Sequence, residues 1–181
     1  MRPLTVAVTG GIGAGKSAAL AAFARRGVPT LSSDEVVHRL IGEDPEVRAA
    51  LEERLGTTNR AEIAAVVFAD PEQLTWLEAL LHPRVRREQE EWLEGLDAEV
   101  AATEIPLLFE VGGEERFDAV VVINAPDDVR ARRTGQARDT RAARLIPDAE
   151  KVRRADFAYV NDGTLDDLDA FVGRVLAQLT G

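Results

Sequence analysis

Residues 10–17 read Gly-Gly-Ile-Gly-Ala-Gly-Lys-Ser and match the pattern G-x-x-x-x-G-K-[ST] at every fixed position. Such a loop binds phosphate groups through converging backbone N–H groups, because glycine lets the backbone approach an anion without a Cβ clash. Lys16 would add positive charge at the β- and γ-phosphates, and the Ser17 hydroxyl would ligate Mg²⁺. The sequence therefore predicts a nucleoside triphosphate site formed by Gly11, Ile12, Gly13, Ala14, Gly15, Lys16 and Ser17.

The segments on either side of this loop support that interpretation. Residues 4–9 are short, apolar and partly β-branched, as expected for a buried parallel strand. Residues 18–26 are rich in helix formers and are followed by Gly27, a common C-terminal cap. Strand, loop and helix stand in the order that phosphate binding requires. A glycine-rich turn that only happens to precede Lys16 is a much weaker interpretation.

Composition limits the remaining possibilities. With 181 residues, 45% of them hydrophobic, the chain suits one α/β domain with a sizeable core and room for a helical insertion. Its net charge of −10 argues against a broad nucleic-acid-binding face. The chain has no cysteine, and we find neither a signal peptide nor an apolar run long enough to cross a membrane. We expect a cytoplasmic protein without nucleic-acid or membrane partners.

The second expected strand, residues 28–32, ends just before Asp34, and a helix follows. Ligands of open α/β sheets lie beyond the carboxyl ends of the strands, so Asp34 could accept a proton from a substrate hydroxyl. An aspartate that caps the helix is the ordinary alternative, and its position alone leaves both open.

No strand signal occurs between about residues 35 and 98. Helix starts are expected at Asp44-Pro45, Asn59-Arg60 and Asp70-Pro71, with one more helix beginning at His82-Pro83-Arg84. We interpret this block as a helical substrate-binding lobe, residues 35–97. His38 and His82, the two histidines, lie too far apart in the sequence to suggest a metal site.

Three further strands are expected in residues 98–105, 117–124 and 157–161, which completes a five-stranded parallel sheet flanked by helices. Glu104, near the end of the third strand, could hold a metal-bound water, although a structural role is more common for such a residue. Thr164 and Asp167 predict a capping box at the start of the last helix.

Arginines gather between Val129 and Arg144 in an otherwise acidic chain. A solvated helix face would explain them, and Arg130 and Arg132 would then matter little. A mobile lid that brings guanidinium groups to a transferring phosphoryl group is the alternative. The six residues concerned are Arg130, Arg132, Arg133, Arg138, Arg141 and Arg144.

Taken in order, the motifs resemble those of the dephospho-CoA kinase family over nearly the whole chain. The His-Pro and Pro-Leu-Leu-Phe-Glu pieces are the specific ones, because other kinases share the phosphate loop without them. The resemblance rests on residues 9–17, Ser33-Asp34, Val67-Phe68-Ala69-Asp70, Leu77-Glu78, His82-Pro83, residues 105–110, Arg138-Asp139, Ala155-Asp156, Asn161 and Gly163.

This resemblance implies a P-loop kinase fold and transfer of the γ-phosphoryl group of ATP, with Mg²⁺, to the 3′-hydroxyl of the dephospho-CoA ribose. It implies that Asp34 is the base and that Asn161 lies near the adenine. Arg138 and, more weakly, Arg141 would act on the phosphates. The dephospho-CoA pocket would comprise Asp34, His82, Pro106, Leu107, Leu108, Glu110 and Arg141.

The chain departs from the family pattern in two places. Ser32-Ser33-Asp34 retains only the last acid of the usual Asp-Ala-Asp, and the segment after Arg138-Asp139 is shorter by roughly two helical turns and lacks the usual glutamine. The expected parts are a core of about residues 1–34, 98–128 and 152–181, the helical lobe, and a short lid of about residues 129–151.

The sequence leaves two alternative functions open. Another kinase of the same fold, such as a nucleoside monophosphate or shikimate kinase, would share the phosphate loop. A nucleotide-dependent switch without enzymatic activity would need a base-specific motif such as Asn-Lys-x-Asp, which we do not find.

Overall fold

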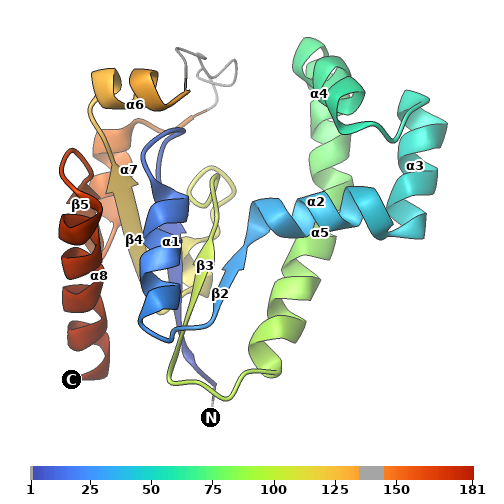
Figure 1. Cartoon of the computed structure of the whole chain (residues 1–181). Helices are drawn as coiled ribbons and strands as arrows, with labels where there is room; N and C mark the ends of the chain where they lie inside the picture. The colour runs from blue at the N-terminus through green and yellow to red at the C-terminus, as the bar shows by residue number, and fades with distance from the viewer. Residues whose placement is uncertain (1, 135–144) are drawn as a thin grey trace. The chain divides into compact units, whose positions relative to one another are not determined.

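The computed structural model describes residues 2–134 and 145–181 (Figure 1). The chain divides into two compact units. The sheet unit comprises Met1–Ser32 and Gly95–Gly181, and the helical unit comprises Ser33–Glu94.

A five-stranded parallel sheet forms the centre of the sheet unit, in the order β2-β3-β1-β4-β5. The prediction of five parallel strands is thereby confirmed, although the second, third and fourth strands each begin two residues later than the sequence pattern suggests. Their bounds are β1 (Leu4–Thr9), β2 (Thr30–Ser32), β3 (Val100–Glu104), β4 (Ala119–Asn124) and β5 (Phe157–Val160).

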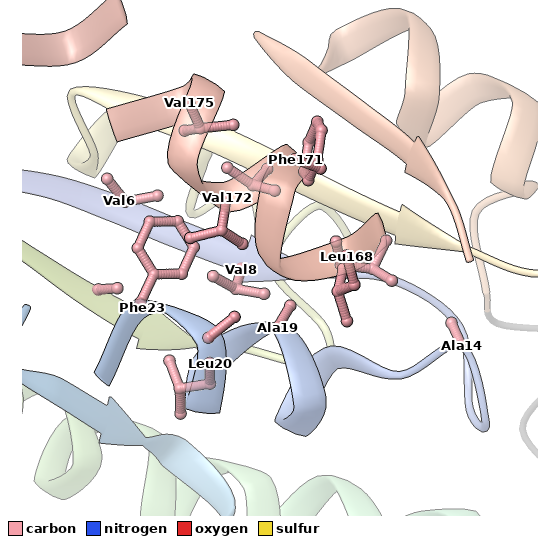
Figure 2. Close-up of a cluster of buried hydrophobic side chains, with 14 of the residues drawn as sticks. Val6, Val8, Ala14, Ala19, Leu20, Phe23, Leu168, Phe171, Val172 and Val175 are labelled. Carbon is pink, nitrogen blue, oxygen red and sulfur yellow. The ribbon is translucent and has the colours of Figure 1, made fainter. Parts of the chain in front are cut away.

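Helices α1 (Lys16–Arg25) and α8 (Leu165–Thr180) pack together over one face of this sheet. Successive side chains of a strand point to opposite faces, so Val6 and Val8 of β1 enter the cluster beneath these helices. They meet Phe23 of α1 and Val172 of α8, all fully buried (Figure 2). The predicted capping box at Thr164 and Asp167 is present and begins α8.

The opposite face of the sheet is covered by the loop after β3 and by residues near α7 (Asp148–Arg154). Ala7 of β1 and Val120 of β4 point to this side and pack with Leu108 and Phe109 of the loop. A 3₁₀ turn (Glu114–Arg116) precedes β4, and α6 (Asp127–Thr134) follows it. Both faces of the central strands are therefore buried, which explains why these strands read as continuous apolar runs.

The helical unit contains α2 (Ser33–Glu43), α3 (Pro45–Leu55), α4 (Arg60–Ala69) and α5 (Pro71–Glu94). Asp44 and Asn59 cap α3 and α4 by accepting hydrogen bonds from backbone N–H groups in the first turn, as their sequence signatures predict. Helix α5 contacts both α2 and α4.

The expected break at His82-Pro83-Arg84 is wrong, because α5 runs without interruption through Pro83. Proline inside a helix removes one N–H donor and crowds the carbonyl four residues earlier, which costs about 3 kcal/mol or more. Here the Arg84 side chain donates to the carbonyl of Leu80 at 2.9 Å and forms an ion pair with Glu46 of α3 at 3.1 Å. Leu81, two residues before Pro83, is buried as well, so α5 has tertiary contacts on both sides of the proline.

Candidate active site

The site is formed where the parallel strands of the sheet unit end. All five strands point the same way, so their carboxyl ends lie along one edge of the sheet. The phosphate loop follows β1, Glu104 ends β3, and Asn161 directly follows β5. Such an edge is where open α/β sheets bind their ligands.

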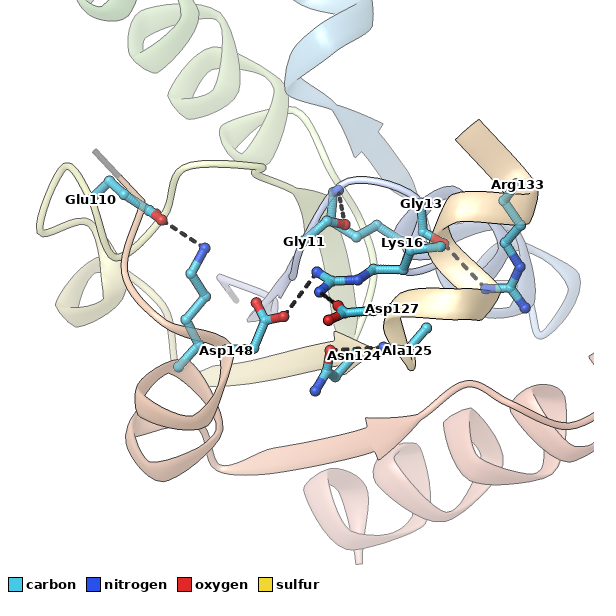
Figure 3. A network of polar contacts seen from close by, with 11 residues as sticks. Gly11, Gly13, Lys16, Glu110, Asn124, Ala125, Asp127, Arg133 and Asp148 are labelled. Atoms are coloured by element: carbon cyan, nitrogen blue, oxygen red, sulfur yellow. Dashed lines mark hydrogen bonds and ion pairs between the residues drawn. The ribbon is translucent and has the colours of Figure 1, made fainter. Parts of the chain in front are cut away.

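The phosphate loop leads directly into α1, which begins at Lys16. Gly15 has a φ of 101°, and a Cβ at this position would collide with the side-chain amide of Asn161, so only glycine fits here. The Lys16 ammonium group donates to the Gly11 carbonyl at 3.1 Å (Figure 3). Backbone N–H groups at the start of α1 and the Lys16 charge thus lie at one point, an arrangement that suits an anion.

Ser17 and Glu104 bring two kinds of oxygen ligand together. The Ser17 hydroxyl donates to Oε2 of Glu104 at 3.2 Å, and the Glu104 side chain is buried at the end of β3. Hydroxyl and carboxylate oxygens are the ligands that Mg²⁺ prefers. The contact brings Glu104 into the phosphate-loop environment.

Asn161 is held against the phosphate loop. Its buried side-chain amide donates to the Ala14 carbonyl at 2.8 Å, and its backbone N–H donates to the Asn124 carbonyl at 2.7 Å. From α6, the Arg133 guanidinium donates to the carbonyls of Gly13, at 3.2 Å, and Asn161, at 3.3 Å. The sequence grouped Arg133 with other arginines, and nothing in its spacing singled it out.

The loop after β3 gives different environments to its candidate residues. Leu108 is buried in the apolar cluster, whereas Pro106 and Leu107 are half-buried. Glu110 accepts from Lys151 at 2.6 Å, and both side chains are more than nine-tenths buried (Figure 3). The backbone N–H of Ile146 donates to the same Glu110 oxygen at 3.2 Å. The contacts of Leu108 and Glu110 therefore shape the loop from inside.

Arg130 is not the solvated residue that its sequence context suggested. Its guanidinium donates to Asp148 of α7 at 2.9 Å and also to Asp127, and only a quarter of its side chain is exposed. The hydrogen bond with Asp127 is the main cause that raises the pKa of Arg130. Arg132 is 72% exposed and pairs only with Asp128, at 3.0 Å, among the contacts of the described residues. Arg138 and Arg141 lie outside the described residues.

Asp34 and His82 belong to the helical unit. Asp34 is exposed and lies within the first turn of α2, which begins one residue earlier, at Ser33. His82 is exposed on α5, next to Pro83. Across residues 2–134 and 145–181, no helix is long and apolar enough to cross a membrane.

Comparison with known proteins gives concordant matches. The family model for dephospho-CoA kinase matches residues 4–167. A dephospho-CoA kinase from Brucella melitensis is 38% identical over 192 residues, covering 98% of this chain and 96% of the relative. A crystal structure of a Thermus thermophilus protein, 38% identical, covers both chains fully with a TM-score of 0.84. A shikimate kinase from Bacteroides thetaiotaomicron, 20% identical with a TM-score of 0.55, shares the fold alone.

Proposed function

Because the chain belongs to the dephospho-CoA kinase family and phosphorylates dephospho-CoA to coenzyme A with ATP, we propose a role for each part of its site. The phosphate loop presents the γ-phosphoryl group of ATP to the 3′-hydroxyl of the dephospho-CoA ribose. The observation that carries this assignment is the loop itself, with Lys16 and Ser17 at the start of α1 and the carboxylate of Glu104 at hydrogen-bond distance from Ser17.

Phosphoryl transfer requires mainly positioning and neutralisation of charge. We propose that the backbone N–H groups of residues 11–17 hold the β- and γ-phosphates and that Lys16 moves from the Gly11 carbonyl to these oxygens. Asn161, which is fixed against Ala14, forms part of the adenine site. Arg138, with a weaker contribution from Arg141, stabilises charge on the group in transfer.

On the acceptor side, we propose that Asp34 orients the ribose hydroxyl and accepts its proton. An exposed carboxylate in a first helical turn is available for this role and is also favoured there by the helix dipole. His82 and the loop at Pro106 and Leu107 contribute to the dephospho-CoA pocket, and Leu108 and Glu110 support that loop through their internal contacts.

The oxygen atoms of Ser17 and Glu104 fit a magnesium ion. Ser17 would ligate the ion directly, and Glu104 would hold it through a water molecule. When bound, Mg²⁺ neutralises charge on the β- and γ-phosphate oxygens. We also propose that the protein is cytoplasmic and works without a nucleic-acid partner, in keeping with its net charge of −10.

The test is incubation of the purified protein with ATP, Mg²⁺ and dephospho-CoA, with the product identified by mass. We expect coenzyme A, one phosphate heavier than the acceptor. Shikimate and nucleoside monophosphates serve as competing acceptors, since a shared fold alone does not distinguish them. Preferential phosphorylation of one of these acceptors would contradict the proposed roles of the acceptor residues.

A further inference from the structure

Arg130 lies against the phosphate loop at two of its glycines. A Cβ built on Gly11 would lie 2.5 Å from Nη1 of Arg130, and one built on Gly13 would lie 3.2 Å from the Arg130 carbonyl oxygen. The first turn of α6 and the loop thus touch with no room for a further carbon atom. A guanidinium group in this position limits where the backbone at Gly11 can go.

Two carboxylates fix the guanidinium in turn. Asp127 lies one helical turn before Arg130 on α6, whereas Asp148 comes from α7 and contacts Nη1 at 2.9 Å (Figure 3). Nη1 is the same atom that lies beside Gly11. Charge-assisted hydrogen bonds to a planar guanidinium define its orientation as well as its place.

Helix α7 is itself anchored from the other side. The buried ammonium group of Lys151 meets the Glu110 carboxylate at 2.6 Å, and the Ile146 N–H donates to the same carboxylate just before α7 begins. Burying such a pair is favourable only when its geometry is good and its hydrogen bonds are made. Oε1 of Glu110 meets both donors, whereas the buried Oε2 has no hydrogen-bond partner among the described residues. Helix α7 therefore carries two polar contacts, one from Lys151 to the loop after β3 and one from Asp148 to Arg130 beside the phosphate loop.

We propose that Arg130 is a positioning residue of the phosphate loop, and that Asp148 acts through it. The proposal rests on the proposed role of the loop in holding the ATP phosphates. Arg130 packs against Gly11 and keeps the loop in the shape that receives phosphates. Without that contact, nucleotide binding must order the loop, so both nucleotide affinity and turnover decrease.

The experiment compares variants on one helix. Arg130→Ala removes the contact with the loop, and Arg130→Lys keeps the charge but loses the planar fork that bonds two carboxylates. Arg132→Ala is the matched control, because Arg132 forms an ion pair on the same helix, with Asp128, and is mostly exposed. For each variant we measure ADP affinity, KM for each substrate, kcat and the melting temperature.

We expect Arg130→Ala to weaken ADP binding and to lower kcat, each by roughly tenfold, the scale of one charged hydrogen bond. KM for dephospho-CoA should stay within about twofold of the wild-type value, because the proposed dephospho-CoA pocket includes neither Arg130 nor Gly11. Arg130→Lys should recover part of both losses. Arg132→Ala should match the wild type in every kinetic measurement.

Asp148→Asn tests whether Asp148 acts through Arg130. If it does, the double variant Arg130→Ala/Asp148→Asn should be no worse than Arg130→Ala alone, a non-additive result. Additive losses would overturn this part of the proposal. If Arg130→Ala only lowered the melting temperature and left ADP affinity and kcat unchanged, Arg130 would be a structural residue and the proposal would be wrong. A wild-type protein without dephospho-CoA turnover would instead contradict the proposed function, whatever Arg130 does to ADP binding.

Discussion

Lys16 concentrates positive charge where the phosphate loop turns into α1, with its ammonium group 3.1 Å from the Gly11 carbonyl. Replacing it with alanine removes that charge from the proposed γ-phosphate site but leaves the backbone of the loop in place. We expect turnover with dephospho-CoA to fall by on the order of 10²-fold or more. The melting temperature should change little, because Lys16 is not part of the buried core. A Lys16→Ala protein with normal turnover would contradict the kinase mechanism.

At Asp34, a catalytic role and a helix-stabilising role predict different effects of one substitution on turnover and on stability. If it only stabilises the first turn of α2, Asp34→Asn should cost about 1 kcal/mol or less and leave turnover unchanged. If it is the base, kcat should collapse while ADP affinity stays that of the wild type. Glu35→Gln is the matched control, since Glu35 is acidic, exposed and in the same first turn. Equal kinetic effects in the two variants would exclude a specific role for Asp34.

Single residues also mark the limit of what the sequence could predict about the site. The phosphate loop could be identified because its function lies in consecutive residues. Arg130 and Arg133 could not be told apart from Arg132, because their partners are far along the chain: Asp148 for Arg130, and the backbone of Gly13 and Asn161 for Arg133. Such contacts depend on how β4, α6 and α7 pack together, and the sequence around each arginine does not indicate that packing.

Among the elements, α8 shows how a terminal cap responds to pH. The Thr164 hydroxyl and the Thr164 N–H both donate to the Asp167 carboxylate and lower its pKa, the hydroxyl having the larger effect. The folded state therefore binds the Asp167 proton more weakly than the unfolded chain does. This stabilisation is complete above the unfolded value of about 3.9 and is lost as the pH falls through the lowered folded pKa.

We therefore expect Asp167→Asn to lower the melting temperature at pH 7 and to have a progressively smaller effect as the pH falls below the unfolded pKa of about 3.9. Thermal unfolding at a series of pH values measures the difference from the wild type. Asp166→Asn is the control, because Asp166 lies in the same first turn but is not the capping-box residue. If both variants lost stability equally at pH 7, the helix dipole rather than the capping box would be responsible.

Elements were predictable where local chemistry and burial agree. The apolar runs of β1 and β4 lie between two packed faces, and Asp44, Asn59 and Thr164 cap helices as their spacing indicates. Pro83 shows the opposite case. Its local preference to begin a helix is not followed: α5 continues through it, and the next residue, Arg84, contacts the Leu80 carbonyl and Glu46 of α3. The proline is evident from the sequence, but the tertiary contacts around it are not.

At the scale of the whole molecule, the chain combines a net charge of −10 with substrates that are themselves anions. In the part of the chain that the structure describes, one positive group beside the phosphate loop is largely neutralised, since Arg130 is paired with Asp127 and Asp148. An approaching nucleotide experiences the field of the whole protein before it experiences the loop, and the range of that field depends on salt. The local site and the overall charge thus act in opposite directions on association.

We expect overall charge to dominate at long range, so that nucleotide association becomes faster as salt increases. The Debye length falls from about 30 Å at 0.01 M to about 10 Å at 0.1 M, which screens the repulsion of the protein while leaving contacts within the loop largely intact. Stopped-flow mixing with a fluorescent ATP analogue, at constant excess Mg²⁺, measures the association rate constant. The slope against ionic strength should be steeper for the triphosphate than for the diphosphate and absent for an uncharged adenosine analogue. An association rate that fell with added salt would contradict this prediction. It would mean that positive groups at the site attract the nucleotide despite the acidic surface, because screening slows association only when the long-range interaction is attractive.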